Sequence, residues 1–226
     1  MSTLVREGST IEVNDKNRTK IILVRHGECE GNLEGLFRGR TDFPLNETGR
    51  SQAQAVARAL KPAGISRVFS SPLSRAMETA RAIADECGVP VEARQGFNNM
   101  ALGPWEGRPK EEIRTEFPEE WEIWLSHPER LSLPGSESLS DVQRRAVANL
   151  DFLVRKYSGE TIAVVSHRAL LKPLMTAALG VEEPSFWRLH LDTASWSLLT
   201  HEKERGYCLV SLNQTSHLDS FVSEWV

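Results

Sequence analysis

The 226 residues are 40% hydrophobic and 26% charged, a composition that suits one globular α/β domain with a sizeable core. With 27 Lys and Arg against 31 Asp and Glu, the net charge is -4, which excludes the broad basic surface of a nucleic-acid-binding protein. The three cysteines are far apart, no apolar run approaches the ~20 residues of a membrane span, and the start lacks a signal-peptide core, so we expect a soluble, cytoplasmic protein without membrane contacts.

The first half of the chain alternates predicted strands and helices. Residues 1–19 are polar and aperiodic and are expected to form a flexible leader. The continuous apolar run over 20–26 predicts a strand buried on both faces. Asn46 is a good N-cap for a helix with Ala53, Val56, Ala57 and Leu60 on one face. A short strand over 67–70 and a helix over 74–87, with Met77 on its apolar stripe, continue the pattern.

The second half contains an irregular segment followed by further regular elements. Residues 96–137 are rich in aromatic residues and prolines, and we expect them to form a helical insertion over the sheet edge. The later predicted elements are a helix over 140–157, a buried strand over 161–167, a helix over 169–179, and strands over 196–200 and 207–212. Together these elements predict a mostly parallel central sheet with helices on both faces. We expect a single domain over 20–213 and a tail over 214–226.

Two of the predicted buried strands end in histidine. The sequences are Val24-Arg25-His26 and Val165-Ser166-His167. Because the carboxyl ends of parallel strands meet at one edge, where open α/β sheets bind ligands, both imidazoles are expected at the same site. Either histidine alone would be interpreted as a polar strand end, but two at one edge favour a functional site.

Two arginines are expected close to these histidines. Arg25 precedes the first histidine, and Arg75 stands where a strand turns into a helix at the same edge. A guanidinium group matches phosphate oxygens and a helix N-terminus adds amide donors, so an anion held by Arg25 and Arg75 would face His26. The alternative for Arg75 is an ordinary ion pair with Glu78 on the helix surface.

Four blocks of sequence in this order resemble the histidine phosphatase (phosphoglycerate mutase-like) superfamily. The blocks are Arg25-His26-Gly27-Glu28 with Asn32, residues 39–49 (GRTDFPLNETG), residues 70–76 (SSPLSRA) and Val165-Ser166-His167. The resemblance runs from about Lys20 to Leu212 and implies a phosphoglycerate mutase-like fold. It also implies that His26 is a nucleophile forming a phosphohistidine and that Arg25, Arg75 and His167 form the phosphate pocket.

Physical chemistry agrees with these roles. Phosphoryl transfer needs an in-line nucleophile and positive charge around the transferred oxygens, and Arg25 should keep His26 neutral and nucleophilic. A protonated His167 would donate to the phosphoryl group, and Asn32 is expected either to donate to the same oxygens or to serve as a turn residue. We expect no metal and no cofactor, because no cluster with ligand spacing is evident.

One position departs from the family pattern. The family usually places a glutamate, the proton carrier, four residues before the first glycine of a segment that reads Gly103-Pro104-Trp105-Glu106-Gly107 here, and that position holds Asn99. Three hypotheses follow: Glu106 or another carboxylate replaces the acid, the substrate has an acidic leaving group, or the pocket binds phosphate compounds without efficient turnover. The alternative for Glu106 is a surface carboxylate or backbone cap, and Asn99 is a candidate for orienting the substrate.

The expected activity is hydrolysis of a small phosphorylated metabolite, a phosphoric monoester. Arg38, Arg40 and Arg168 suggest a substrate with a second anionic group, although such arginines also serve solubility. Residues 134–138 (PGSES) resemble the phosphatase branch, and the alternatives are a phosphoglycerate-type mutase or a catalytically weak phosphate-binding relative. The aromatic residues of 96–137, with Phe221 and Trp225, are compatible with a homodimer contact as well as with core packing.

Overall fold

The structure is a computed structural model that describes residues 18–224. The predicted leader therefore lies almost entirely outside the described residues, as does Trp225. Phe221 is 41% exposed, and the homodimer stays a prediction. Within residues 18–224, no helix is both long enough and apolar enough to cross a bilayer.

A six-stranded sheet forms the centre of the molecule, in the order β4-β3-β6-β1-β7-β8. The strands are β1 (Thr19–Arg25), β3 (Arg67–Ser70), β4 (Val91–Ala93), β6 (Thr161–Ser166), β7 (Trp196–Glu202) and β8 (Gly206–Gln214). Strands β4, β3, β6 and β1 run parallel to one another, whereas β7 runs antiparallel to both β1 and β8. The mostly parallel sheet is confirmed. The three-residue β4 was not predicted, because so short a strand has no detectable alternation.

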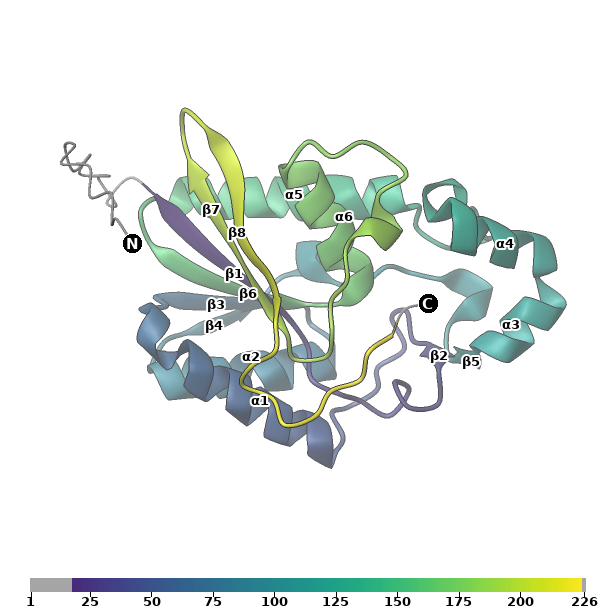
Figure 1. Ribbon diagram of the computed structural model, residues 1–226, viewed down its shortest axis with the longest axis horizontal. Coiled ribbons are helices and arrows are strands. Elements are labelled where there is room, and N and C mark those ends of the chain that lie inside the picture. The colour runs from purple at the N-terminus through teal and green to yellow at the C-terminus, as the bar shows by residue number, and fades with distance from the viewer. Residues whose placement is uncertain (1–17, 225–226) are drawn as a thin grey trace, which may run out of the picture.

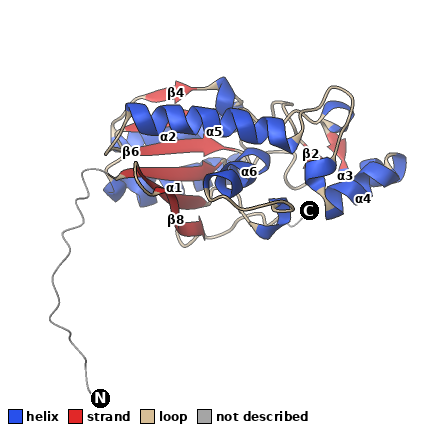
Figure 2. Cartoon of the chain, turned by 90° about the horizontal axis from the view of Figure 1, so that it is seen from above, coloured by secondary structure: helices blue, strands red, loops and turns tan. Residues whose placement is uncertain are grey.

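Helices cover both faces of this sheet (Figures 1 and 2). The helices α1 (Glu47–Leu60) and α2 (Ser74–Cys87) lie on one face, and α5 (Leu139–Lys156) and α6 (Arg168–Ala178) lie on the other. In β1, Ile22 and Val24 pack toward α1 and α2, whereas Ile21 and Leu23 pack toward α5 and α6. This alternation explains why the strand is apolar at every position.

The packing of α1 and α2 confirms most of the helix predictions and corrects one. The Asn46 side chain accepts a hydrogen bond from the Gly49 backbone N–H at 2.8 Å, as expected of an N-cap. Met77 is only half-buried, whereas Ala76 and Thr79 are fully buried. The prediction for Met77 was wrong because α2 is turned toward the end of β1, where the Thr79 hydroxyl accepts a hydrogen bond from the Gly27 N–H.

The irregular segment lies beyond the carboxyl ends of the parallel strands (Figure 1). It contains α3 (Lys110–Glu116), α4 (Pro118–Ser126) and β5 (Arg108–Pro109), which pairs with β2 (Leu36–Phe37) in a second small sheet. Within residues 18–224, the 3-10 turns are Lys61–Ala63, Gln95–Phe97, Gly103–Trp105, Pro128–Arg130 and Phe186–Arg188. Trp105 and Trp124 are buried in the core shared with α5 and α6. These two aromatic residues therefore pack in the core.

Candidate active site

The parallel pairing of β1 with β6 brings the two strand-end histidines together. Arg25 is in register with Ser166, so His26 and His167 leave the sheet side by side. Their ring centroids are 5.1 Å apart, and both residues are 2% exposed. Ser166, the last residue of β6, donates its hydroxyl to the Phe97 carbonyl at 2.8 Å. Ser166 is thus a backbone hydrogen-bonder, and the histidines carry the reactive groups at this edge.

The hydrogen bond of His26 determines which ring nitrogen can react. Nδ1 lies 2.6 Å from the Gly27 carbonyl oxygen. Because a carbonyl oxygen can only accept, Nδ1 carries the proton and Nε2 keeps the lone pair. Burial, together with the positive charges of Arg75, Arg25 and Arg38, holds the pKa of His26 well below its ordinary value. His26 is therefore a neutral imidazole whose Nε2 can act as a nucleophile.

His167 is also neutral in this state. Its Nε2 lies 2.8 Å from the Ser71 hydroxyl oxygen, while Nδ1 is buried without a hydrogen-bond partner among the described residues. Burial is the largest cause that lowers the pKa of His167 well below its ordinary value, and the positive charge of Arg75 lowers it further. The expected protonated His167 would consequently require a bound anion, whose negative charge would raise this pKa.

Arg75 is fully buried rather than placed on a helix surface. Its guanidinium donates to the backbone carbonyls of Thr41 and Gly39, at 3.0 Å each, and its charged partner is Asp42 at 3.9 Å. The alternative of an ion pair between Arg75 and Glu78 is therefore wrong, because the Arg75 side chain turns inward from the start of α2 toward the histidines. Its Nε is buried and has no hydrogen-bond partner within residues 18–224, which leaves one donor for a ligand.

Arg25 and Asn32 meet a residue that the sequence did not single out. Arg25 donates to the Leu191 carbonyl at 2.7 Å and forms a buried ion pair with Glu224, while its Nε has no described partner. Asn32 acts as a turn residue by accepting from the Cys29 N–H at 2.9 Å, and its Nδ2 donates to Glu224 Oε2 at 3.0 Å. No sequence signal pointed to Glu224, which lies about 200 positions away from these partners.

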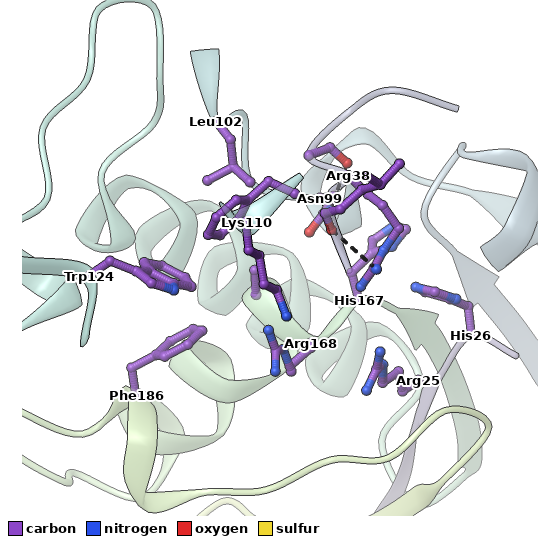
Figure 3. A pocket seen from close by; sticks show the side chains of 14 residues that line it. Arg25, His26, Arg38, Asn99, Leu102, Lys110, Trp124, His167, Arg168 and Phe186 are labelled. Atoms are coloured by element: carbon purple, nitrogen blue, oxygen red, sulfur yellow. Dashed lines mark hydrogen bonds between the residues drawn. The ribbon is translucent and has the colours of Figure 1, made fainter. Parts of the chain in front are cut away.

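Both histidines and Arg25 line a cleft of about 490 Å³, counting its open mouth, whereas Arg75 and Asn32 are not part of its lining. Its polar lining comprises Arg25, His26, Arg38, Asn99, Lys110, His167 and Arg168, and its apolar lining includes Leu36, Phe37, Leu102, Trp124 and Phe186. Figure 3 shows the basic ends of Arg25, Lys110 and Arg168 directed toward the middle of this cleft. Lys110 was not anticipated; burial lowers its pKa to about 8, and the charge of Glu224 opposes that shift. The cleft is suited to an anionic ligand.

The remaining predicted arginines take different places. Arg38 lines the cleft and donates to Glu224 Oε1 at 3.1 Å, and Arg168 donates to the backbone carbonyl of Glu224 at 2.5 Å. Arg40 does not line the cleft. Its Nε donates to the Asn99 carbonyl at 3.2 Å, and its guanidinium pairs with Glu137 at 2.9 Å. Arg40 therefore supports the backbone that carries Asn99.

Asn99 is part of the cleft wall, at the position where the family pattern has a glutamate. Its Nδ2 donates to the Gly39 carbonyl at 2.7 Å, and its Oδ1 is buried without a described partner. Glu106 instead accepts the Leu102 N–H at 2.9 Å and is absent from the cleft lining. The backbone-cap interpretation of Glu106 fits this contact. Among residues 18–224, no three His, Cys, Asp or Glu side chains gather into a possible metal site.

Comparison with known proteins agrees with the four sequence blocks and with this geometry. A sequence model of the Histidine phosphatase superfamily (branch 1) matches residues 21–215. The chain belongs to this family. Phosphoserine phosphatase 1 of Hydrogenobacter thermophilus is 34% identical over 205 residues, which cover 91% of this chain and 97% of that protein. Probable phosphoglycerate mutase GpmB of Yersinia enterocolitica is 32% identical over 205 residues, covering 88% and 95%.

Solved structures of this histidine phosphatase family share the same fold. The crystal structure of a phosphoserine phosphatase from Entamoeba histolytica, in complex with 3-phosphoglyceric acid, has a TM-score of 0.80 at 30% identity. That match covers 88% of this chain and 99% of the other. The family and these relatives support a phosphatase activity on a small phosphorylated molecule.

Proposed function

We propose that the protein hydrolyses a small phosphoric monoester through a phosphohistidine on His26. One observation carries this proposal: a neutral His26, with its lone pair on Nε2, lies beside His167 in a buried site under the charges of Arg25 and Arg75. Two buried arginine donors that lack hydrogen-bond partners also support the proposal. The Nε atoms of Arg25 and Arg75 have no described acceptor, and phosphoryl oxygens would satisfy both.

The first step would transfer the phosphoryl group to the protein. Nε2 of His26 attacks phosphorus, the bond from phosphorus to the ester oxygen breaks, and the departing alkoxide takes a proton from solvent water. Arg25, Arg75 and a His167 protonated on ligand binding would stabilise the charge on the three other oxygens. The Gly27 carbonyl, 2.6 Å from Nδ1, would stabilise the positive charge that develops on the imidazole.

The second step would transfer the phosphoryl group to water. Water attacks phosphorus, the bond to Nε2 breaks, and inorganic phosphate leaves while His26 returns to its neutral form. Both steps need a proton carrier near the departing or attacking oxygen, and Asn99 cannot provide one. A substrate with an acidic alcohol would reduce this need in the first step.

The cation-rich cleft supports a substrate with a second anionic group, such as a carboxylate. Arg38, Arg168 and Lys110 line the cleft together with the histidines. The alternatives, a phosphoglycerate-type mutase and a phosphate-binding protein with weak turnover, use the same pocket. A mutase would return the phosphoryl group from His26 to another hydroxyl of the substrate instead of to water.

The test is to trap the intermediate. The protein would be mixed with p-nitrophenyl phosphate, 3-phosphoglycerate or phosphoserine carrying labelled phosphate, and quenched in base, where phosphohistidine survives. We expect acid-labile label on the wild type, release of inorganic phosphate, and no label on His26→Ala. Label that persists on His26→Ala would overturn the assignment of the nucleophile. Label that moves between hydroxyls without phosphate release would establish the mutase.

A further inference from the structure

The segment after β8, residues 215–224, returns to the active site and is called the tail segment here (Figure 1). Glu224 is its one buried residue, at 6% exposure, while the rest of the segment is exposed or half-buried. Its carboxylate contacts Arg25, Asn32 and Arg38. From the sequence, Arg25 and Asn32 were expected to contact the phosphoryl group, and Arg38 was expected to contact a second anionic group of the substrate.

The contacts of Glu224 are those of a bound anion. The Arg25 guanidinium and the Asn32 amide both donate to Oε2, and Arg38 donates to Oε1 at 3.1 Å and to Oε2 at 3.2 Å. The charges of Arg25, Arg38, Arg168 and Lys110 hold the pKa of Glu224 well below its ordinary value, against the effect of burial. Glu224 is therefore ionised at neutral pH, and a single carboxylate faces four basic groups.

Outside this site, the tail segment is held by hydrogen bonds that are spread along its length. The Ser220 carbonyl accepts from Gln52 at 3.0 Å, and Val222 exchanges two hydrogen bonds with Thr193: its N–H donates to the hydroxyl at 3.1 Å and its carbonyl accepts from the N–H at 3.5 Å. The Ser223 hydroxyl lies 3.0 Å from His190 Nε2, and His217 Nε2 lies 3.1 Å from the Ala194 carbonyl. Each such bond contributes roughly 1 kcal/mol net, and the segment contains neither helix nor strand. An anion that replaces the Glu224 carboxylate therefore has no helix or strand of this segment to unfold.

We propose that Glu224 occupies the subsite for the second anionic group of the substrate, so that this glutamate competes with the substrate and selects phosphomonoesters whose own anionic group can replace it. This inference rests on the proposed function, because it assigns a subsite of the same pocket. The phosphoryl group would bind the partnerless Nε donors near His26, while the second anionic group would take the positions of the two Glu224 oxygens. A monoester without that group would leave Glu224 in place and bind weakly.

A matched pair of ligands tests the subsite. 3-Phosphoglycerate carries a carboxylate where glycerol 3-phosphate carries a neutral hydroxymethyl group. Binding would be measured by calorimetry in a His26→Ala background, where no turnover occurs, and KM would be measured in the active protein. The variants are Glu224→Gln, which keeps the shape, and Glu224→Ala, which vacates the subsite. Asp219→Asn is the matched control, because it removes an exposed carboxylate from the same segment.

If Glu224 fills the subsite nine-tenths of the time, its removal should tighten 3-phosphoglycerate binding by about tenfold. Glycerol 3-phosphate should change by less than about threefold, and Asp219→Asn should change neither. Weaker binding of 3-phosphoglycerate to both Glu224 variants would overturn the proposal, since Glu224 would then position the arginines. An equal gain for both ligands would also overturn it, because the competition would not be specific to the second anion.

Hydrogen exchange on the protein with native Glu224 gives a second measurement that needs no tail substitution. Saturating 3-phosphoglycerate should speed exchange of the amides over 218–224, and glycerol 3-phosphate should not. Unchanged exchange with both ligands would overturn the displacement of the tail segment. Because binding and exchange are read without turnover, these results stay interpretable even if the phosphohistidine is never trapped and the proposed hydrolysis fails.

Discussion

Asn99 lines the cleft, and only one of the two polar atoms of its side-chain amide makes a hydrogen bond. The Nδ2 group donates to the Gly39 carbonyl, and the buried Oδ1 has no partner within the described chain. An acceptor in this state can orient a substrate hydroxyl or a water molecule but cannot exchange a proton near neutral pH. The chemistry of the site therefore depends on the substrate's leaving group more than it would with a carboxylic acid at this position.

The substitution Asn99→Glu would restore a proton carrier. Well-placed acid–base groups contribute roughly 10²–10⁴-fold, so we expect at least about a tenfold rise in kcat on an alkyl phosphate. The gain on p-nitrophenyl phosphate should be smaller, because that leaving group departs without protonation. The rates of both substrates would be measured for the wild type and the variant. Asn99→Gln, which has the length of glutamate without the proton, is the control, and an equal gain in this variant would contradict the argument.

At the scale of single elements, the helix α6 starts at the active-site end of β6 and carries a buried lysine. The helix begins at Arg168, directly after His167, and places Lys172 one turn later at 1% exposure. The Lys172 ammonium lies 4.7 Å from the Phe186 ring centroid and 4.8 Å from that of Trp187. Burial, with the nearby charge of Arg168, lowers the pKa of Lys172 to about 6, although the ring faces offset part of this cost.

Replacing this lysine by methionine should stabilise the protein. Between pH 6 and 10.5 the unfolded chain binds a proton at Lys172 that the folded protein lacks, so this group costs stability, and the cost diminishes as the pH rises through that window. We expect Lys172→Met to raise the free energy of unfolding at pH 7 by on the order of 1–3 kcal/mol, and by less at pH 10. Urea denaturation measures both values. The exposed Lys203→Met serves as control, and a destabilised Lys172→Met would show that the ammonium is needed.

At the scale of the whole molecule, the active site couples stability to pH. Folding places both histidines in a buried, positively charged site that holds them neutral. Their folded pKa values lie below the ordinary value of 6.5, so below pH 6.5 the unfolded chain binds protons that the folded protein does not. Acid therefore destabilises the protein in this range, and the histidines have no such effect above it.

We expect the free energy of unfolding to fall between pH 6.5 and 5 by up to about 1.4 kcal/mol per pH unit for each histidine. Lys172 contributes little below pH 6, because it is then protonated in both states. Denaturation would be followed at several pH values for the wild type and for His26→Gln, which should lose the part of the slope that His26 contributes, while His167 and His217, whose pKa values burial also lowers, keep theirs. A slope that is unchanged in His26→Gln would assign the acid sensitivity to other groups.

The sequence by itself determined the alternation of strands and helices and the two strand-end histidines. These features depend on local apolar patterns, caps and the parallel pairing of two buried strands, which together bring His26 and His167 to one edge. The cap at Asn46 and the bounds of α2 follow from the same local rules, whereas the face of α2 was misassigned at Met77 because its contacts lie on other elements.

Only the tertiary structure decided how the charges of the site are arranged. Arg75 turns inward to carbonyls more than thirty residues away, Lys110 reaches the cleft from α3, and Glu224 arrives from a segment about 200 residues beyond Arg25. No sequence spacing encodes such contacts, since they result from packing two helix layers and an irregular segment around one sheet edge. Residue types at strand ends thus pointed to the histidines, whereas long-range folding placed an internal carboxylate among the basic groups of the cleft.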